Sequence, residues 1–131
     1  MSRHIFCFLI WKLVILQCGR MIRRFELYIL DEALEFLNSL DEKTYRKIMY
    51  NIEKAMFKND ATLFKKLQNG IWEFRTLHLR RHYRMFAFWN TSAINNVVIV
   101  THGLVKKTDK VPKQEIEKAM IRREMYYNSM L

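Results

Sequence analysis

Cysteine, glycine and proline are scarce in this 131-residue sequence, and each shortage excludes a class of protein. The two cysteines, Cys7 and Cys18, both lie in the first twenty residues, so the body of the chain has neither a disulfide framework nor a cysteine-based metal site. Three glycines could hardly support a P-loop or a dinucleotide-binding fingerprint, and the four histidines lack the paired spacing of a zinc helix. We therefore expect a cytoplasmic protein without a metal centre.

Half of the residues are apolar and only four are glycine or proline, which favours one ordered domain with a real core. The net charge of +10 is unevenly distributed. Residues 61–131 hold thirteen basic and five acidic side chains, whereas residues 21–60 hold seven basic and eight acidic ones. This asymmetry suggests a polyanionic partner for the C-terminal half, the alternative being a basic surface that serves only solubility.

The apolar stretch within residues 1–20 is interrupted by Lys12 and is too short to cross a bilayer as a helix. It has the outline of a signal peptide, but the residues before Cys18 are larger than processing peptidases prefer. A third interpretation takes Met21 as the true start, because a well-formed domain begins directly after it. We favour this interpretation and treat 21–131 as the folded domain, with no membrane partner.

Hydrophobic periodicity predicts an α+β fold in the order β-α-α-β-β-β-α. We expect a small, mainly antiparallel sheet packed on an N-terminal helical hairpin, with a further helix at the C-terminus. Gly103 is expected to end the last strand, and the lysine-rich segment 104–111 to be a loop. The expected elements are strands at 22–30, 71–79, 83–90 and 96–102, helices that begin at the caps Asp31 and Asp41, and a last helix with Pro112 at its first position.

Two strand-like runs within 71–90 each carry an arginine among apolar neighbours. Hydrophobic pattern gives no reason to place Arg75 and Arg84 there, because burying an unpaired guanidinium is costly. A hairpin would bring the two arginines near one another, and Lys106 and Lys107 follow the end of the third strand beside them. These positions predict one basic cluster.

Converging cations of this kind bind phosphate, and arginine can do so through two parallel hydrogen bonds. The cluster could hold a nucleic-acid backbone, or it could stabilise the charge that develops when a phosphodiester is cleaved. In the alternative interpretation the arginine has only a structural role: Arg75 pairs with an acidic neighbour such as Glu73 or Glu115 on a solvated sheet face.

Several motifs fall in an order that resembles a known family. They are FKKL before the hairpin, IWEFRTL and HYRMFAFW within it, and THGLVKKTDKVPKQEIEKA after it. Over about residues 21–126 the chain resembles the RelE/ParE toxin superfamily, and most closely its HigB-like, phage-derived Gp49-like branch. The most specific motif is His102-Gly103 followed by the lysine pair and by Pro112.

The resemblance implies the toxin of a type II toxin–antitoxin pair: a small basic ribonuclease that enters the ribosomal A site and cuts mRNA. Such enzymes use the 2′-OH of the substrate as nucleophile, so no metal or cofactor is expected. The implied partners are a cognate antitoxin, expected to be an adjacently encoded helix-turn-helix protein, and the ribosome with its mRNA. The alternatives are a gyrase inhibitor of the ParE kind and a degenerate toxin that binds only its antitoxin and operator DNA.

The resemblance also implies roles for single residues. Arg84 matches the arginine that contacts the scissile phosphate, and Arg75 matches a basic position that acts in proton transfer or charge stabilisation. Lys106 or Lys107 falls where members of the superfamily place a cation near the leaving group. Lys66 lies at a position suited to contact with the RNA backbone.

We add Arg80, Arg81 and Lys110 to the expected RNA-binding residues, since they lie in the basic turn and the lysine-rich loop. The sequence departs from the superfamily at Glu73, where well-known RelE enzymes have a basic residue, and it has no tyrosine near the start of the last helix. The sequence therefore does not identify the general base. His102 is a candidate because an ordinary imidazole titrates near neutral pH, although a histidine at a strand end can be structural.

We predict that the native protein begins at Met21. Intact mass spectrometry of the protein purified from its own host should give the mass of residues 21–131, and a mass that includes Met1 would contradict this.

Overall fold

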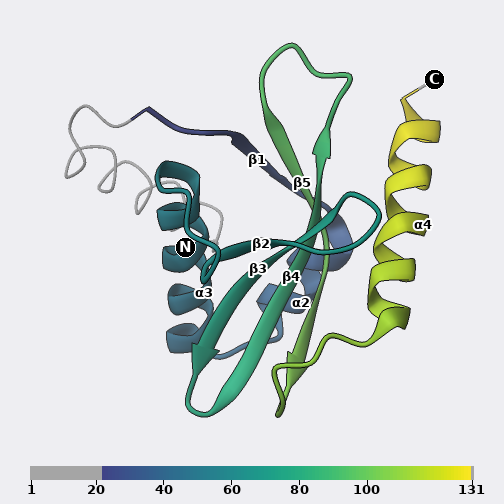
Figure 1. Cartoon of the computed structure of the whole chain (residues 1–131). Coiled ribbons are helices and arrows are strands. Elements are labelled where there is room, and N and C mark those ends of the chain that lie inside the picture. Colours follow the sequence, from purple (N-terminus) through teal and green to yellow (C-terminus); the bar gives the residue numbers. More distant parts are fainter. Residues whose placement is uncertain (1–21, 131) are drawn as a thin grey trace.

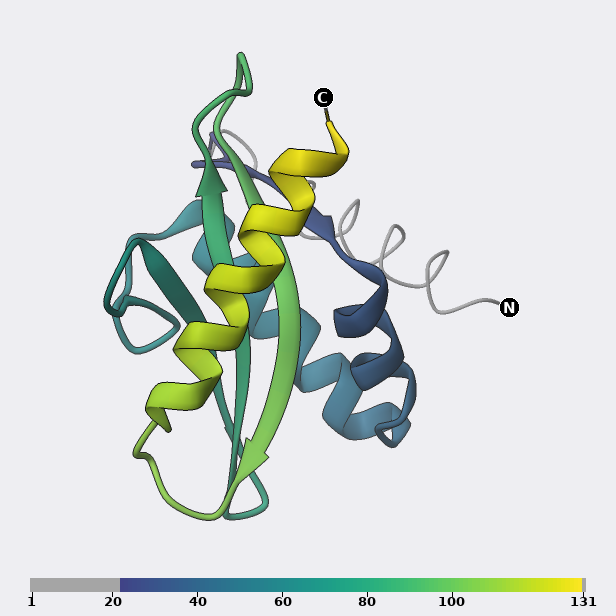
Figure 2. The ribbon, with the colours of Figure 1, turned by 90° about the vertical axis from the view of Figure 1, so that its right-hand side faces the viewer.

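A five-stranded mixed sheet runs through the computed structural model, which describes residues 22–130 (Figure 1). The strand order is β1-β5-β4-β3-β2; β1 and β5 are parallel, and the other neighbouring pairs are antiparallel. Helices α2 and α3 cover one face and α4 crosses the other, as the view onto α4 shows (Figure 2). The elements are β1 Glu26–Ile29, α2 Asp31–Asn38, α3 Glu42–Phe57, β2 Phe64–Lys66, β3 Ile71–His78, β4 Arg81–Asn90, β5 Val97–Lys106 and α4 Lys113–Ser129.

Side-chain alternation along the strands divides the apolar residues between two cores. The larger core joins the sheet to α2 and α3, and its strand residues include Phe74, Met85 and Val98. The smaller core joins the other face to α4, where Ile71, Phe86, Phe88 and Ile99 meet Ile116 and Ala119. A sheet buried on both faces by helices at either end of the chain is the α+β fold that the periodicity predicts.

The helix starts differ slightly from expectation. Asp41 caps α3 as predicted, because its side chain accepts a hydrogen bond from the Thr44 backbone N–H at 3.2 Å. Asp31 is the first residue of α2 rather than its cap, which is Leu30 and has no side-chain cap bond. Likewise Pro112 precedes α4, and the helix begins at Lys113. Asp31 lies in the first turn, where the helix dipole favours an acidic side chain.

Two expectations about the strands were wrong. No strand was expected between the helical hairpin and residue 71, but Phe64–Lys66 forms the edge strand β2, with Phe64 opposite Phe74 on β3. Gly103 does not end the last strand, because β5 continues to Lys106. The glycine is needed instead for close packing: a Cβ at position 103 would lie 2.1 Å from Phe36 Cδ1 on α2.

Among residues 22–130, no helix combines the length and the apolar character that crossing a membrane would require. The expectations for residues 1–20, and for a start at Met21, lie outside the described residues.

We predict that Gly103→Ala lowers the free energy of unfolding by about 1–3 kcal/mol, because the added methyl group overpacks the site against the Phe36 ring. Urea denaturation followed by circular dichroism measures this loss. Phe36→Ala removes the ring and provides the control: the double variant should lose less stability than the sum of the two single losses. Strictly additive losses would contradict the proposed contact.

Candidate functional site

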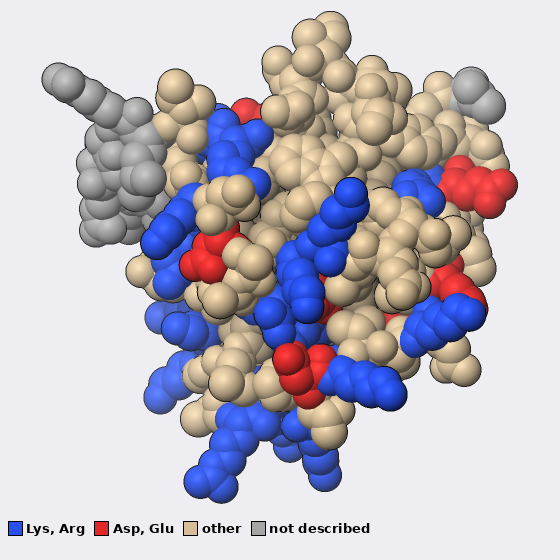
Figure 3. All heavy atoms as spheres, in the orientation of Figure 1, with Lys and Arg blue, Asp and Glu red and all other residues tan. Residues whose placement is uncertain are grey.

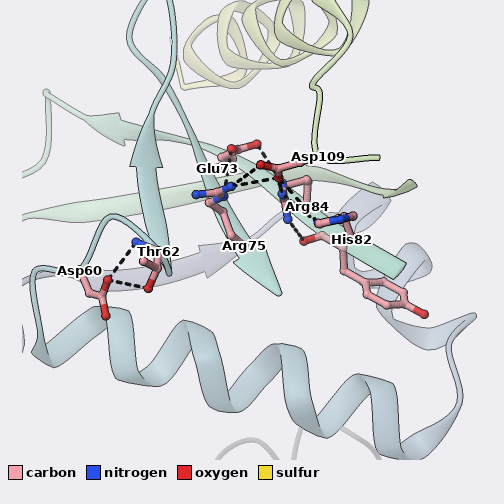
Figure 4. Close-up of polar contacts among 8 residues, drawn as sticks. Asp60, Thr62, Glu73, Arg75, His82, Arg84 and Asp109 are labelled. Atoms are coloured by element: carbon pink, nitrogen blue, oxygen red, sulfur yellow. Dashed lines mark hydrogen bonds and ion pairs between the residues drawn. The ribbon is translucent and has the colours of Figure 1, made fainter. Parts of the chain in front are cut away.

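Arg75 and Arg84 are direct partners in the ladder between β3 and β4, so their side chains lie on the same face of the sheet (Figure 4). This is the face that α4 covers further along, because Phe86, two residues beyond Arg84, packs in the core beneath α4. The strand ends that carry the two arginines extend past α4 (Figure 2). The structure therefore brings the arginines together, as the hairpin predicts, beside the start of that helix.

Glu73 is two residues before Arg75 on β3 and therefore lies on the same face of the sheet; it is only 2% exposed. Its carboxylate oxygens lie 3.5 Å from Arg75 Nε and 3.4 Å from Arg84 Nε. Burial raises the pKa of Glu73, while the charges of Arg84 and Arg75 act in the opposite direction. Arg84 is itself 2% exposed, and its Nη1 donates to the Tyr83 carbonyl at 3.2 Å. Glu73 and Arg84 thus form a buried charge pair beneath the site.

Asp109, in the loop between β5 and α4, closes over the two guanidinium groups (Figure 4). Arg75 Nη2 donates to both carboxylate oxygens of Asp109, at 2.9 and 3.0 Å, and Arg84 Nη2 donates to Asp109 Oδ1. The hydrogen bond from Arg75 holds the pKa of Asp109 below its usual range. The basic cluster that the sequence predicts therefore also contains two carboxylates, which pair with both arginines. Arg75 does pair with Glu73, as the alternative interpretation had it, but Glu115 binds elsewhere.

Lys106 ends β5 opposite His82 and completes the cluster. Its Nζ is buried without a hydrogen-bond partner among the described residues. Burial lowers the pKa of Lys106, and the nearby charge of Arg84 lowers it further. We call Arg75, Arg84 and Lys106 the cation cluster; with Glu73 and Asp109 in place, these three cations face two carboxylates.

A hollow of about 300 Å³ lies beside the cation cluster. On the face of the molecule drawn in Figure 3, lysine and arginine side chains gather in the middle and lower part, with a few acidic atoms among them. Basic side chains outnumber acidic ones in the lining of the hollow, which favours an anionic ligand. The hollow is lined by Lys65, Leu67, Gln68, Glu73, Arg75, Asp109, Lys110, Val111 and Ile116.

The remaining basic residues of the predicted site are spread more widely. Lys66 lies opposite Trp72, which packs in the core under α3, so it faces away from the cluster; Lys65, opposite Glu73, is the lysine on the cluster's face. Lys110 lines the hollow, whereas Lys107 is exposed in the loop after β5.

Arg80 and Arg81 are exposed at the tip of the β3–β4 hairpin. Leu79 and Arg80 form its two-residue turn in the left-handed region, with φ of 50° and 64°. Neither arginine contacts the cation cluster in any interaction within residues 22–130. Of the predicted RNA-binding residues, only Lys110 therefore lies at the hollow.

His102 is enclosed and does not reach the open site. Its side chain is 2% exposed, and its ring stacks on Phe86 with centroids 4.8 Å apart. Nε2 lies 2.7 Å from Glu115 Oε2 on α4, and Nδ1 lies 2.9 Å from Thr101 Oγ1. Burial lowers the pKa of His102 and favours the neutral ring, although Glu115 opposes this. With both nitrogens occupied, His102 ties β5 to α4 and is not placed to act as a base.

The imidazole that reaches the cluster is that of His82, which the sequence did not single out. Its side chain is 22% exposed, and Nδ1 lies 3.4 Å from Arg84 Nη2 and 3.7 Å from Asp109 Oδ1. The signal that could have found it was alternation, because His82 precedes Arg84 by two residues. Asp109 had no such signal, since its position depends on how the loop folds.

No group of three or more histidine, cysteine or acidic side chains within residues 22–130 is placed to hold a metal ion. The family model described as phage derived protein Gp49-like (DUF891) matches residues 35–124, which include the whole cation cluster, Glu73, His82 and Asp109. A search of the curated proteins found no match.

We predict that Arg84→Ala lowers the free energy of unfolding by about 3–5 kcal/mol, because it leaves the buried Glu73 carboxylate without its main counter-charge. Guanidinium denaturation at pH 7 measures the loss. The double variant Glu73→Gln/Arg84→Met, which removes both charges, should recover a large part of it. Equal losses of stability in the single and double variants would show that the cost of Arg84→Ala does not come from an unpaired Glu73 carboxylate.

Proposed function

The chain belongs to the Gp49-like family of the RelE/HigB-like toxin superfamily, and from this membership we propose that it is a toxin that cleaves mRNA on the ribosome. The family is associated with toxin–antitoxin systems. In this proposal residues 21–131 form the toxin domain, which acts in the cytoplasm and is neutralised by a cognate antitoxin. The experiments below address the mRNA cleavage.

The observation that carries this proposal is the pair of guanidinium groups on adjacent strands, next to a basic hollow. Two arginines side by side can bind the non-bridging oxygens of one phosphodiester. Donors fixed by a rigid sheet also stabilise the additional negative charge of the transition state without having to reorganise. This property distinguishes a nuclease site from a general basic surface.

In the proposed reaction the 2′ oxygen of the RNA bonds to phosphorus, and the bond from phosphorus to the 5′ oxygen breaks. His82 accepts the proton of the 2′-OH, and Lys106 gives a proton to the departing 5′ oxygen. Burial lowers the pKa of Lys106, which makes its ammonium a better acid. Arg75 and Arg84 hold the phosphate, and no cofactor takes part.

One observation favours a second candidate, a toxin that retains antitoxin binding but not catalysis. Glu73 and Asp109 neutralise much of the charge of the two arginines, and the superfamily resemblance leads one to expect a basic residue at position 73. Inhibition of gyrase in the manner of ParE requires no phosphate-binding cluster, and a supercoiling assay separates it from mRNA cleavage.

We predict that expression of the full chain, or of residues 21–131, arrests growth and produces cleaved mRNA detectable by primer extension. Arg75→Gln should reduce cleavage by about 10²–10³-fold, the usual cost of removing one transition-state donor. Arg75 is the better test than Arg84, because it is less deeply buried and its loss disturbs the fold less.

Lys43→Gln on the exposed side of α3 is the matched control, since it also removes one positive charge but lies on the opposite side of the sheet. Circular dichroism should show that both variants are folded. Undiminished cleavage by Arg75→Gln would contradict the assigned role. Arrest without mRNA cleavage, together with loss of supercoiling activity, would favour gyrase inhibition.

A further inference from the structure

Asp109 occupies the position between the guanidinium groups that a bound phosphate would need. Both of its carboxylate oxygens accept from Arg75 Nη2, and Oδ1 also accepts from Arg84 Nη2. His82 Nδ1 lies 3.7 Å from the same oxygen. Three groups from β3 and β4, those of Arg75, Arg84 and His82, therefore lie against this one carboxylate (Figure 4).

A carboxylate and a phosphodiester present similar chemistry to arginine. Both offer two oxygens that share a negative charge, and both accept the paired hydrogen bonds of a guanidinium. The two anions cannot occupy the same donors together, because like charges at hydrogen-bond distance repel strongly. Binding of RNA at Arg75 and Arg84 therefore requires Asp109 to leave.

The two carboxylates of the site differ in how easily they could leave. Glu73 is buried on a central part of the sheet, with a side chain only 3% exposed. The Asp109 side chain is 58% exposed and lies in the loop 107–112, whose neighbouring Lys107 and Lys110 are also exposed. Because Asp109 is solvated on its outer side, replacing it with another anion that pairs with the same arginines costs little free energy. Only Asp109 is placed to be exchanged.

We propose that Asp109 is an internal anion that occupies the phosphate position of the free protein and is displaced by an RNA phosphodiester. The identity of the displacing anion rests on the proposed function. In the free protein the carboxylate keeps Arg75 and Arg84 in the geometry that the phosphate then uses, and it weakens binding of polyanions that cannot displace it. The loop 107–112 thereby sets the affinity of the site.

The test is the affinity of the purified full chain for a short single-stranded DNA, measured by fluorescence anisotropy at one fixed salt concentration. DNA presents the phosphodiester but lacks the 2′-OH, so the binding measured is independent of cleavage. Asp109→Asn should bind about fivefold tighter or more, because an amide does not compete for the guanidinium groups as a carboxylate does. Asp109→Ser provides a second removal of the charge.

Asp60→Asn is the matched control, because Asp60 is also a loop aspartate, and its carboxylate accepts from the Thr62 backbone N–H at 2.9 Å, away from the cluster. It changes the net charge equally and should alter affinity by less than about twofold. Asp109→Glu keeps a carboxylate in the loop and should stay near the unaltered protein. Thermal melting should confirm that all variants are folded.

Affinities of Asp109→Asn and Asp109→Ser no tighter than that of Asp60→Asn would overturn the proposal. The result also separates it from the proposed function. Tighter DNA binding by Asp109→Asn, in a protein that does not cut mRNA, would support the internal anion and contradict the proposed nuclease activity. Cleavage of mRNA by the unaltered protein, without tighter DNA binding by Asp109→Asn, would support the nuclease and contradict the internal anion.

Discussion

The structure of the site depends on one electrostatic arrangement, the placement of two arginines directly opposite one another across β3 and β4. Two guanidinium groups this close repel, and the sheet keeps them together because Glu73 lies beneath both at 3.4–3.5 Å. A buried pair of this kind contributes little net stability but is costly to break. Its effect is to fix two cations at one point, with a part of their charge left for a ligand above them.

The rest of the fold determines what surrounds that point. Helix α4 covers only part of its face of the sheet, and the strand ends that carry Arg84 and Lys106 extend beyond it (Figure 2). The pair of His102 and Glu115 joins β5 to the first turn of α4, and these are the two elements that flank the loop that carries Asp109. Close packing of Phe36 on Gly103 keeps β5 in its position along the sheet.

Periodicity was sufficient for the fold and for the arginine pair, because alternation and hairpin pairing are local properties of the sequence. Periodicity did not predict the features of the structure that are set by tertiary contacts. Gly103 was interpreted as a strand break, although its lack of a side chain accommodates a helix. The three residues of β2 are too few to show alternation, so Lys66 was chosen where Lys65 faces the site. Asp109 reaches the arginines through a loop conformation that no spacing rule predicts.

The central claim is that Arg75 and Arg84 together form the phosphate-binding position of this protein. The most direct measurement is an NMR titration of the guanidinium Nε–Hε resonances with a dinucleotide that carries one phosphodiester and a 2′-O-methyl group, which prevents cleavage. The account predicts that the resonances of Arg75 and Arg84 shift together along a single binding curve. Shifts confined to Arg80 and Arg81 at the hairpin tip would contradict it.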